Sequence, residues 1–432
     1  MLDSPWDLRM STVVIEVSPE HLTTGLYVCG LDRPWEETPF LFQGFTIESD
    51  DELQMLRRLC KMVFVEVSVE DVEELKSAGR KSPAMVAPAP EAPDPLAQLS
   101  TNLTALIDKV PLKDSTSLET ELTQAKNIFD EAKRAVGNVF DHLRRGGGLD
   151  VPDLQAAVGS MVDSVFRNRD AMGWLASMKN KDDYLYNHSL AAAVWALAFG
   201  RHLGLDKETL KVVGTGAMLL DLGKTRLTTE LLQRPGKPSE AEWQMIRAHV
   251  DHGVKILEAA PNVDKRIMTM IVTHHERLDG TGYPNNLKGE EIPLIGRIAA
   301  IVDCYDAMIS ERSYAKAKST FDAVRELKRL GGLAFPSELV ELFIQAVGVF
   351  PTGTLVELNT GEVGVVVGQN RYRRLRPEVM LILDAHKKVR DEFTTINLLT
   401  CEENIGKTEP TLWIANGLER GAHGIDPSEY FV

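Results

Sequence analysis

The chain has few cysteines, no long apolar run and no excess of basic residues, and each shortage excludes a class of protein. Its four cysteines, Cys29, Cys60, Cys304 and Cys401, are scattered without paired spacing, which argues against a disulfide framework and a zinc knuckle. The longest apolar runs, such as 191–199, are far shorter than the roughly 20 residues that span a bilayer, and the N-terminus shows no secretion signal. We therefore expect reduced thiols, no membrane span and a cytoplasmic location.

The chain also has fewer basic than acidic residues. The 432 residues include 48 Lys and Arg against 63 Asp and Glu, which gives a formal net charge of -15. A chain this acidic does not offer a broad surface to nucleic acid polymers, so any phosphate contacts should be local. With 44% hydrophobic residues, the composition is that of a globular protein, and this length fits two or three domains.

Local patterns predict three regions in the first third of the chain. Residues 1–75 combine strand-like segments with one amphipathic helical segment, DDELQMLRRLCK, and predict a small α+β N-terminal domain. Residues 76–100 are rich in Ala and Pro and predict an extended linker. Residues 101–150 contain a long proline-free amphipathic stretch, Leu118 to Arg145, which predicts a helical connector.

The remaining two thirds predict two further regions. Residues 151–347 show repeated helical patterns with few strand signals and hold most of the histidines. Residues 348–432 alternate at period two around a predicted hairpin turn at Asn359-Thr360-Gly361 and predict a small β-rich region. The chain is thus expected to be a multidomain protein with a mainly α-helical core.

The helical region contains residues of the kind that hold metal ions. Imidazole and carboxylate together suit Zn, Fe, Mn or Ni, and no cysteine accompanies them. Each residue alone has an ordinary alternative, because a histidine on an apolar helix is often a satisfied core residue and a buried carboxylate needs only a cation or donors. In chain order, the candidates are His188, Asp221, His249, His274, His275 and Asp303.

The segment HHERLDGTGYP, residues 274–284, strengthens the metal hypothesis. Two adjacent histidines at the end of a helical pattern can reach one site, and the glycines allow a tight loop beside it. This segment resembles the GYP signature of the HD-GYP family, a branch of the HD superfamily of metal-dependent phosphohydrolases. YNHSLAAAVWALA, LLDLGKTRL, RPGKPSEAEWQMIRAHVDHG and LKGEEIPLIGRIAAIVDCYDAM extend the resemblance over residues 182–347. The stretch GLYVCGLDRPWEETPFLFQGFTI resembles DUF3391, a domain of unknown function often found ahead of HD-GYP domains.

The resemblance implies a phosphodiesterase that hydrolyses cyclic di-GMP to pGpG or GMP at a site with two or three divalent metals such as Fe or Mn. The six candidates above match the family's metal ligands, and Asp221 matches the carboxylate that bridges two metals. Lys224 matches a lysine that meets phosphate and, with Asp221, would be catalytic. Lys224, Tyr283, Asp306 and Arg312 match positions that contact the nucleotide, for which their charge and aromatic character are suitable.

The sequence departs from the family pattern at one metal position. The name-giving His-Asp pair is Leu220-Asp221, and leucine cannot donate to a metal. One metal site then retains only His188, Asp221 and Asp303 and is expected to bind more weakly. Tyr184 stands where members with three metals have Glu, which favours at most two metals.

Three functions remain open at this stage. Hydrolysis can survive the loss of one ligand, since a metal with three protein ligands and water can be catalytic. Alternatively, the domain binds cyclic di-GMP without cleaving it, or serves only as a protein-interaction module in bacterial signal transduction. Signalling proteins such as diguanylate cyclases are the partners that the resemblance suggests.

Overall fold

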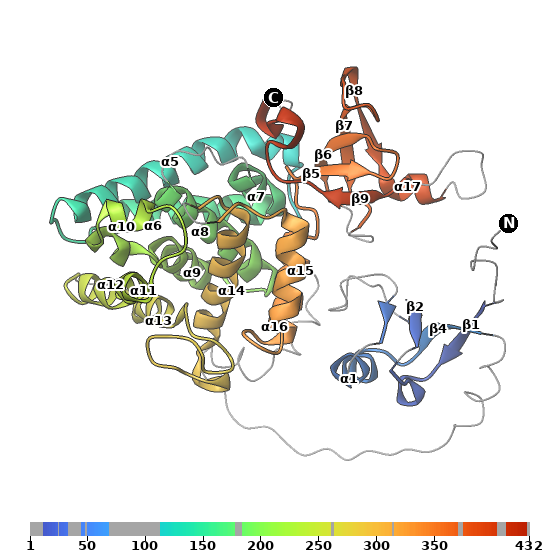
Figure 1. The fold of residues 1–432 in the computed structure, drawn as a ribbon, viewed down its shortest axis with the longest axis horizontal. Coiled ribbons are helices and arrows are strands. Elements are labelled where there is room, and N and C mark those ends of the chain that lie inside the picture. The colour runs from blue at the N-terminus through green and yellow to red at the C-terminus, as the bar shows by residue number, and fades with distance from the viewer. Residues whose placement is uncertain are drawn as a thin grey trace. The chain divides into compact units, whose positions relative to one another are not determined.

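The computed structural model describes residues 12–24, 26–32, 45–47, 50–68, 113–177, 184–260, 263–312, 315–369, 375–403 and 412–429. The chain divides into two compact units, Met1–Pro93 and Asp94–Val432 (Figure 1). The predicted linker, residues 76–100, lies outside the described residues.

The N-terminal unit is a four-stranded antiparallel sheet with one helix. Its elements are β1 (Thr12–Val17), η1 (Pro19–His21), β2 (Tyr27–Leu31), β3 (Phe45–Thr46), α1 (Asp50–Leu59) and β4 (Val63–Ser68). The strands lie in the order β1-β4-β2-β3, so the last strand pairs between the first two. Leu53, Leu56 and Leu59 recur at helical spacing on α1 and are buried, which gives the helix its apolar face. The α+β prediction is confirmed.

The second unit is mainly helical, as predicted. Its helices are α5 (Leu118–Arg144), α6 (Pro152–Arg167), α7 (Arg169–Ser177), α8 (Tyr184–His202), α9 (Lys207–Leu219), η3 (Leu222–Arg226), α10 (Thr229–Gln233), α11 (Glu240–Arg247), α12 (His249–Glu258), α13 (Lys265–Thr273), η4 (Gly289–Glu291), α14 (Leu294–Ile309), α15 (Thr320–Leu330) and α16 (Ser337–Val347). Among the described residues, none of the helices is both long enough and apolar enough to cross a bilayer.

The centre of the helical core is formed by α8 and α14, whose middles are apolar on nearly every side. Ala191 to Leu197 of α8 and Ile298 to Val302 of α14 are all buried. A helix that is apolar all round must be covered on every face, and α9, α13 and α16 supply part of the cover. A polar side chain that projects from either helix therefore enters a protein interior.

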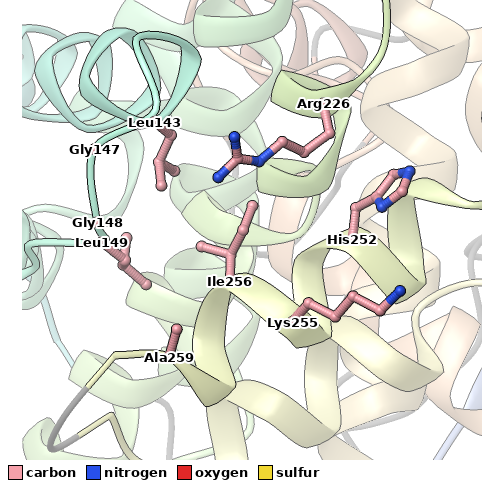
Figure 2. Close-up of a pocket in the computed structure, with 9 residues that line it drawn as sticks. All are labelled: Leu143, Gly147, Gly148, Leu149, Arg226, His252, Lys255, Ile256 and Ala259. Atoms are coloured by element: carbon pink, nitrogen blue, oxygen red, sulfur yellow. The ribbon is translucent and has the colours of Figure 1, made fainter.

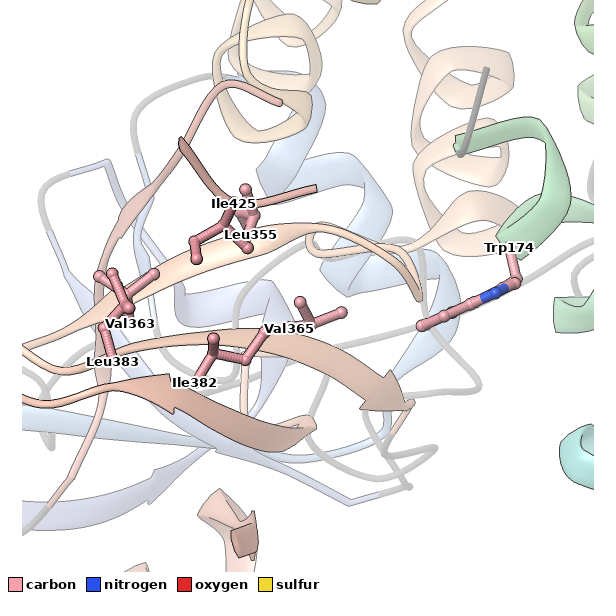
Figure 3. Packing of buried hydrophobic residues seen from close by; sticks show 7 residues of the cluster. All are labelled: Trp174, Leu355, Val363, Val365, Ile382, Leu383 and Ile425. Carbon is pink, nitrogen blue, oxygen red and sulfur yellow. The ribbon is translucent and has the colours of Figure 1, made fainter. Parts of the chain in front are cut away.

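A five-stranded antiparallel sheet follows the helices. It comprises β5 (Leu355–Leu358), β6 (Val363–Gly368), β7 (Glu378–Leu383), β8 (Val389–Asn397) and β9 (Ile414–Gly417), in the order β8-β7-β6-β5-β9, with α17 (Leu398–Glu403), η5 (Ala422–Gly424) and η6 (Pro427–Glu429). Trp174 of α7 belongs to the same buried cluster as Val365 of β6 and Leu355 of β5 (Figure 3). The β-rich prediction for this region is confirmed.

One contact between two short elements positions part of the site described below. A Cβ added at Gly223 of η3 would lie 1.8 Å from the carbonyl oxygen of His249 and 2.6 Å from the backbone nitrogen of Gly253. Both are backbone atoms of α12, which cannot swing aside as a flexible side chain can. Only glycine fits there, and the contact fixes Asp221, the residue before η3, relative to His249.

We expect Gly223→Ala to lower the free energy of unfolding by about 1–3 kcal/mol, because the added methyl forces η3 away from α12. Gly137→Ala is the matched control, since an added Cβ there meets nothing within 4 Å. Gly137 lies in the middle of α5, so its replacement by alanine should raise the free energy of unfolding by about 0.5–1 kcal/mol. Urea unfolding of the full chain measures both, and equal stability of the two variants would contradict the close contact.

Candidate metal centre

Imidazoles and carboxylates from five helical elements meet inside the helical core. His188 comes from α8, Asp221 from the start of η3, and His249 is the first residue of α12. His274 and His275 follow the end of α13, and α14 supplies Asp303 and Asp306. All but His275 are buried. The structure therefore brings together the six candidate ligands that the sequence singled out.

Four of these residues form a compact group of possible metal ligands. Asp221, His249, His274 and His275 each offer one ligand atom, and these atoms all lie within 4.8 Å of one another. The Nε2 atoms of His249 and His274 are 3.4 Å apart, and His249 Nε2 lies 3.5 Å from Asp221 Oδ1. That oxygen is buried and accepts no hydrogen bond from the described residues. A buried carboxylate oxygen beside three imidazoles fits a divalent metal.

Backbone carbonyls orient two of the imidazoles. His249 Nδ1 lies 2.7 Å from the carbonyl oxygen of Ile246, and His274 Nδ1 lies 2.8 Å from that of Ile271. A carbonyl accepts only, so each Nδ1 donates and each Nε2 of the neutral ring keeps its lone pair for the group's centre. Burial lowers the pKa of His249 to about 4 and also lowers the pKa of His274, which favours these neutral rings.

His188 stands among carboxylates. Its Nδ1 lies 2.7 Å from Asp306 Oδ2, and its Nε2 lies 3.1 Å from Asp303 Oδ1 and 3.5 Å from Asp221 Oδ2. Burial lowers the pKa of His188, but the hydrogen bonds to Asp303 and Asp306 outweigh it and raise the pKa to about 9. Both ring nitrogens of His188 thus face carboxylates, whose negative charge favours the protonated ring.

Asp306 has surroundings that differ from the nucleotide contact implied by the resemblance. Its carboxylate is fully buried. Oδ1 accepts a hydrogen bond from Trp195 Nε1 at 3.1 Å, and Oδ2 accepts from His188 Nδ1 and from the Ser310 hydroxyl. Because protein donors occupy both oxygens, Asp306 is placed to orient His188 rather than to reach a ligand. Trp195 is a member of this network that the sequence reasoning missed.

Lys224 lies at the edge of the centre. Its ammonium is 2.6 Å from Asp221 Oδ2, and its side chain is 17% exposed. Burial raises the pKa of Asp221, but the positive charge of Lys224 is the largest opposing influence, and the pKa lies below its ordinary value. Asp221 is therefore ionised, as a metal ligand must be.

An aromatic stack borders the centre on another side. The Tyr283 ring stacks on the His275 ring with centroids 4.6 Å apart, and the Arg247 guanidinium lies 5.3 Å from the Tyr283 centroid. Arg247 is exposed and forms no ion pair with a carboxylate among the residues that the structure describes. Sequence reasoning singled out Tyr283 but missed Arg247, whose partner is distant in the chain. Arg312 lies in the turn after α14, where its backbone pairs with Ala315.

The loop that carries Tyr283 is held from within. Glu276 is buried, and its carboxylate accepts hydrogen bonds from the backbone N–H groups of Asn285 and Leu287 at 2.7 and 3.0 Å. Asp279 caps the turn by accepting from the N–H and hydroxyl of Thr281. These two acids therefore fix the loop.

Comparisons with known families match three parts of the chain. A model of the HD domain matches residues 174–339, a domain of unknown function (DUF3391) matches residues 14–154, and a KOW domain associated with the HD domain matches residues 355–405. The fold and the buried group of histidines and aspartates thus define a metal-dependent phosphohydrolase of the HD class.

Similarity to individual relatives shows to which branch of the HD class the chain belongs. The cyclic di-GMP phosphodiesterase PA4108 of Pseudomonas aeruginosa is 32% identical over 372 residues, which cover 85% of each chain. The 3'3'-cGAMP-specific phosphodiesterase 2 of Vibrio cholerae is 34% identical over 159 residues, 37% of this chain and 30% of that protein. Among solved structures, Bd1817, an HDGYP protein from Bdellovibrio bacteriovorus, aligns over 77% of this chain and 98% of its own, at 17% identity and a TM-score of 0.44. The chain belongs to the HD-GYP family of phosphodiesterases.

We expect Asp306→Asn to lower the free energy of unfolding by about 1–3 kcal/mol, because an amide turns an N–H towards His188 or Trp195 and leaves a buried donor without an acceptor. Asp163→Asn removes an acid whose ion pair with Lys207 is about half exposed, and it should cost less than about 0.5 kcal/mol. Urea unfolding compares the two. If Asp306→Asn lowers the free energy of unfolding no more than Asp163→Asn does, the buried network contributes little to stability.

Proposed function

We propose that this chain hydrolyses cyclic di-GMP in bacterial second-messenger signalling, giving pGpG or GMP. The relative that carries this activity in its name aligns over 85% of both chains, and this full-length similarity favours cyclic di-GMP over 3'3'-cGAMP, whose named relatives align over shorter parts. The observation that carries the proposal is the buried group Asp221, His249, His274 and His275, a donor set suited to a divalent metal. Opening the ring adds one water across a phosphodiester: a P–O bond to water forms, the P–O3' bond breaks, and the 3' oxygen leaves with a proton.

The proposed metal is Fe or Mn, held by the four-residue group. When bound, such a metal supplies Lewis-acid activation of water and of the phosphodiester. Lys224 is the proposed catalytic partner of Asp221, because its ammonium is partly exposed and can offset charge on a phosphate. Tyr283, Arg247 and Arg312 are proposed to contact the nucleotide. Asp306 is proposed to position His188.

A second metal position is proposed at His188, Asp221 and Asp303, so that the centre is binuclear with unequal sites. Leu220, which is buried, occupies the place of the missing ligand and offers no donor. The short contacts of His188 with Asp303 and Asp306 further suggest that this position is satisfied by an imidazolium when metal is scarce. The second position should therefore bind metal more weakly than the first.

A catalytically inactive sensor is the second candidate function, and Leu220 is the observation that favours it. In that case, the domain binds cyclic di-GMP intact and passes its occupancy to a signalling protein such as a diguanylate cyclase in the cytoplasm. The N-terminal unit is then the proposed contact for that partner. The two candidates differ in whether the nucleotide survives.

Turnover of cyclic di-GMP by full-length protein, purified without oxygen and loaded with Mn or Fe, tests the proposal. We expect pGpG or GMP, measured by chromatography, with slower turnover of 3'3'-cGAMP. Asp221→Asn should reduce turnover by more than the about 10–100-fold typical of groups that only support a ligand. Asp163→Asn is the control and should retain activity, since Asp163 pairs with Lys207 on an exposed face of α6. If cyclic di-GMP binds to the protein but is recovered intact, the proposal of an active enzyme is wrong and the inactive sensor takes its place.

Restoring the missing histidine tests the unequal sites. We expect the native chain to retain about one tightly bound Mn or Fe after dialysis and Leu220→His to retain about two, because an imidazole completes the weaker position. Leu220→Gln is the matched control, since it is polar but offers a poor ligand. Metal analysis gives the number of metal ions per chain for each protein. Thermal unfolding verifies that each variant is folded. Two tightly held metals in the native chain, or no gain in Leu220→His, would contradict the assignment.

A further inference from the structure

A pocket of about 290 Å³ lies where the end of α5 and the glycine loop after it meet η3 and α12 (Figure 2). None of the residues proposed to hold metal lines it. Leu143 of α5 and Ile256 of α12 are buried and give the pocket an apolar floor. Its volume is close to the lower end of the range for small-molecule sites.

The polar residues of this pocket are all basic. Arg226 ends η3, and His252 and Lys255 lie one turn apart on α12. Figure 2 shows the Arg226 guanidinium directed towards Leu143, above Ile256, whereas the His252 ring and the Lys255 ammonium on α12 point away from it. No carboxylate lines the pocket, and within the described part of the chain these three side chains form no ion pair.

This local charge contrasts with the rest of the molecule. The chain has a formal net charge of -15, so basic side chains generally have acids available to pair with. A guanidinium and an ammonium left without such partners, beside an apolar floor, attract an anion that also carries an apolar group. Guanidinium matches the oxygens of phosphate in a two-pronged arrangement, which favours a phosphate ester.

We propose that this pocket binds a small phosphorylated organic molecule, with its phosphate held by Arg226 and its organic part against Leu143 and Ile256. The site is separate from the metal centre and goes beyond the proposed hydrolysis. Binding in this pocket requires neither turnover nor bound metal, so its test does not depend on whether the chain hydrolyses cyclic di-GMP.

Calorimetric titration of the full chain, with and without Mn, tests the site. Phenyl phosphate is the probe, because it combines a phosphate with a compact apolar group. Inorganic phosphate lacks the apolar group, and benzoate replaces the phosphate with a carboxylate. We expect phenyl phosphate to bind more tightly than either, with the same affinity when metal is absent.

Three variants locate the binding. Arg226→Gln should weaken phenyl phosphate binding at least about tenfold by removing a charge-assisted contact. Gly148→Leu should abolish binding by filling the pocket, and the backbone tolerates it because an added Cβ there meets nothing within 4 Å. Lys388→Gln removes an equal charge from an exposed turn between β7 and β8 and should change nothing. Thermal unfolding verifies that each variant is folded.

The proposal is overturned by any of three results. Phenyl phosphate could give no saturable binding, so that no site exists. Lys388→Gln could weaken binding as much as Arg226→Gln does, which would indicate general charge attraction. Binding could vanish on metal removal while the pocket variants leave it unchanged, which would place the probe at the metal centre.

Discussion

The buried carboxylate of Asp221 is the constraint on which the centre of this molecule depends. An ionised carboxylate in a protein interior is costly unless cations or donors surround it. Lys224 approaches one oxygen to 2.6 Å, while the other accepts no hydrogen bond from the described residues and faces His249. His188 Nε2 lies 3.5 Å from the same oxygen that Lys224 approaches, and the glycine contact of η3 with α12 holds Asp221 in place beside His249. A divalent metal would give the remaining oxygen of Asp221 a partner.

The cluster around Asp221 has two sides that differ in their chemistry. On one side, three imidazoles and Asp221 offer a full set of metal donors. On the other, both ring nitrogens of His188 face the carboxylates of Asp303 and Asp306. Hydrogen bonds within the protein therefore already satisfy the second side, whereas the first side leaves one oxygen of Asp221 without a hydrogen bond from the described residues.

Much of this could be predicted from the sequence, and the limits have physical reasons. Apolar periodicity predicted the helical core and the two β regions, but it carries no information on strand order, so the insertion of β4 between β1 and β2 was not foreseen. The resemblance to the HD-GYP family, rather than the spacing of the residues, predicted which histidines and aspartates meet. Asp303 and Asp306 are three positions apart on one helix, so their shared face towards His188 was a usable signal. The indole of Trp195, 111 residues from Asp306, and the guanidinium over Tyr283 come together only through tertiary packing, which leaves no local trace.

The separation of the ligands along the chain has a consequence for the lifetime of the protein. Residues from His188 to Asp303 must converge before a metal can be held, so binding energy is available only to the folded chain. Without a bound metal, the buried oxygen of Asp221 would lack that partner and the folded state would lose the binding energy, so the chain would open more often, and opened chains are what cellular proteases degrade. Supply of a divalent metal would then set how many copies persist as well as how many are active, and the abundance of the protein would report the metal status of the cell.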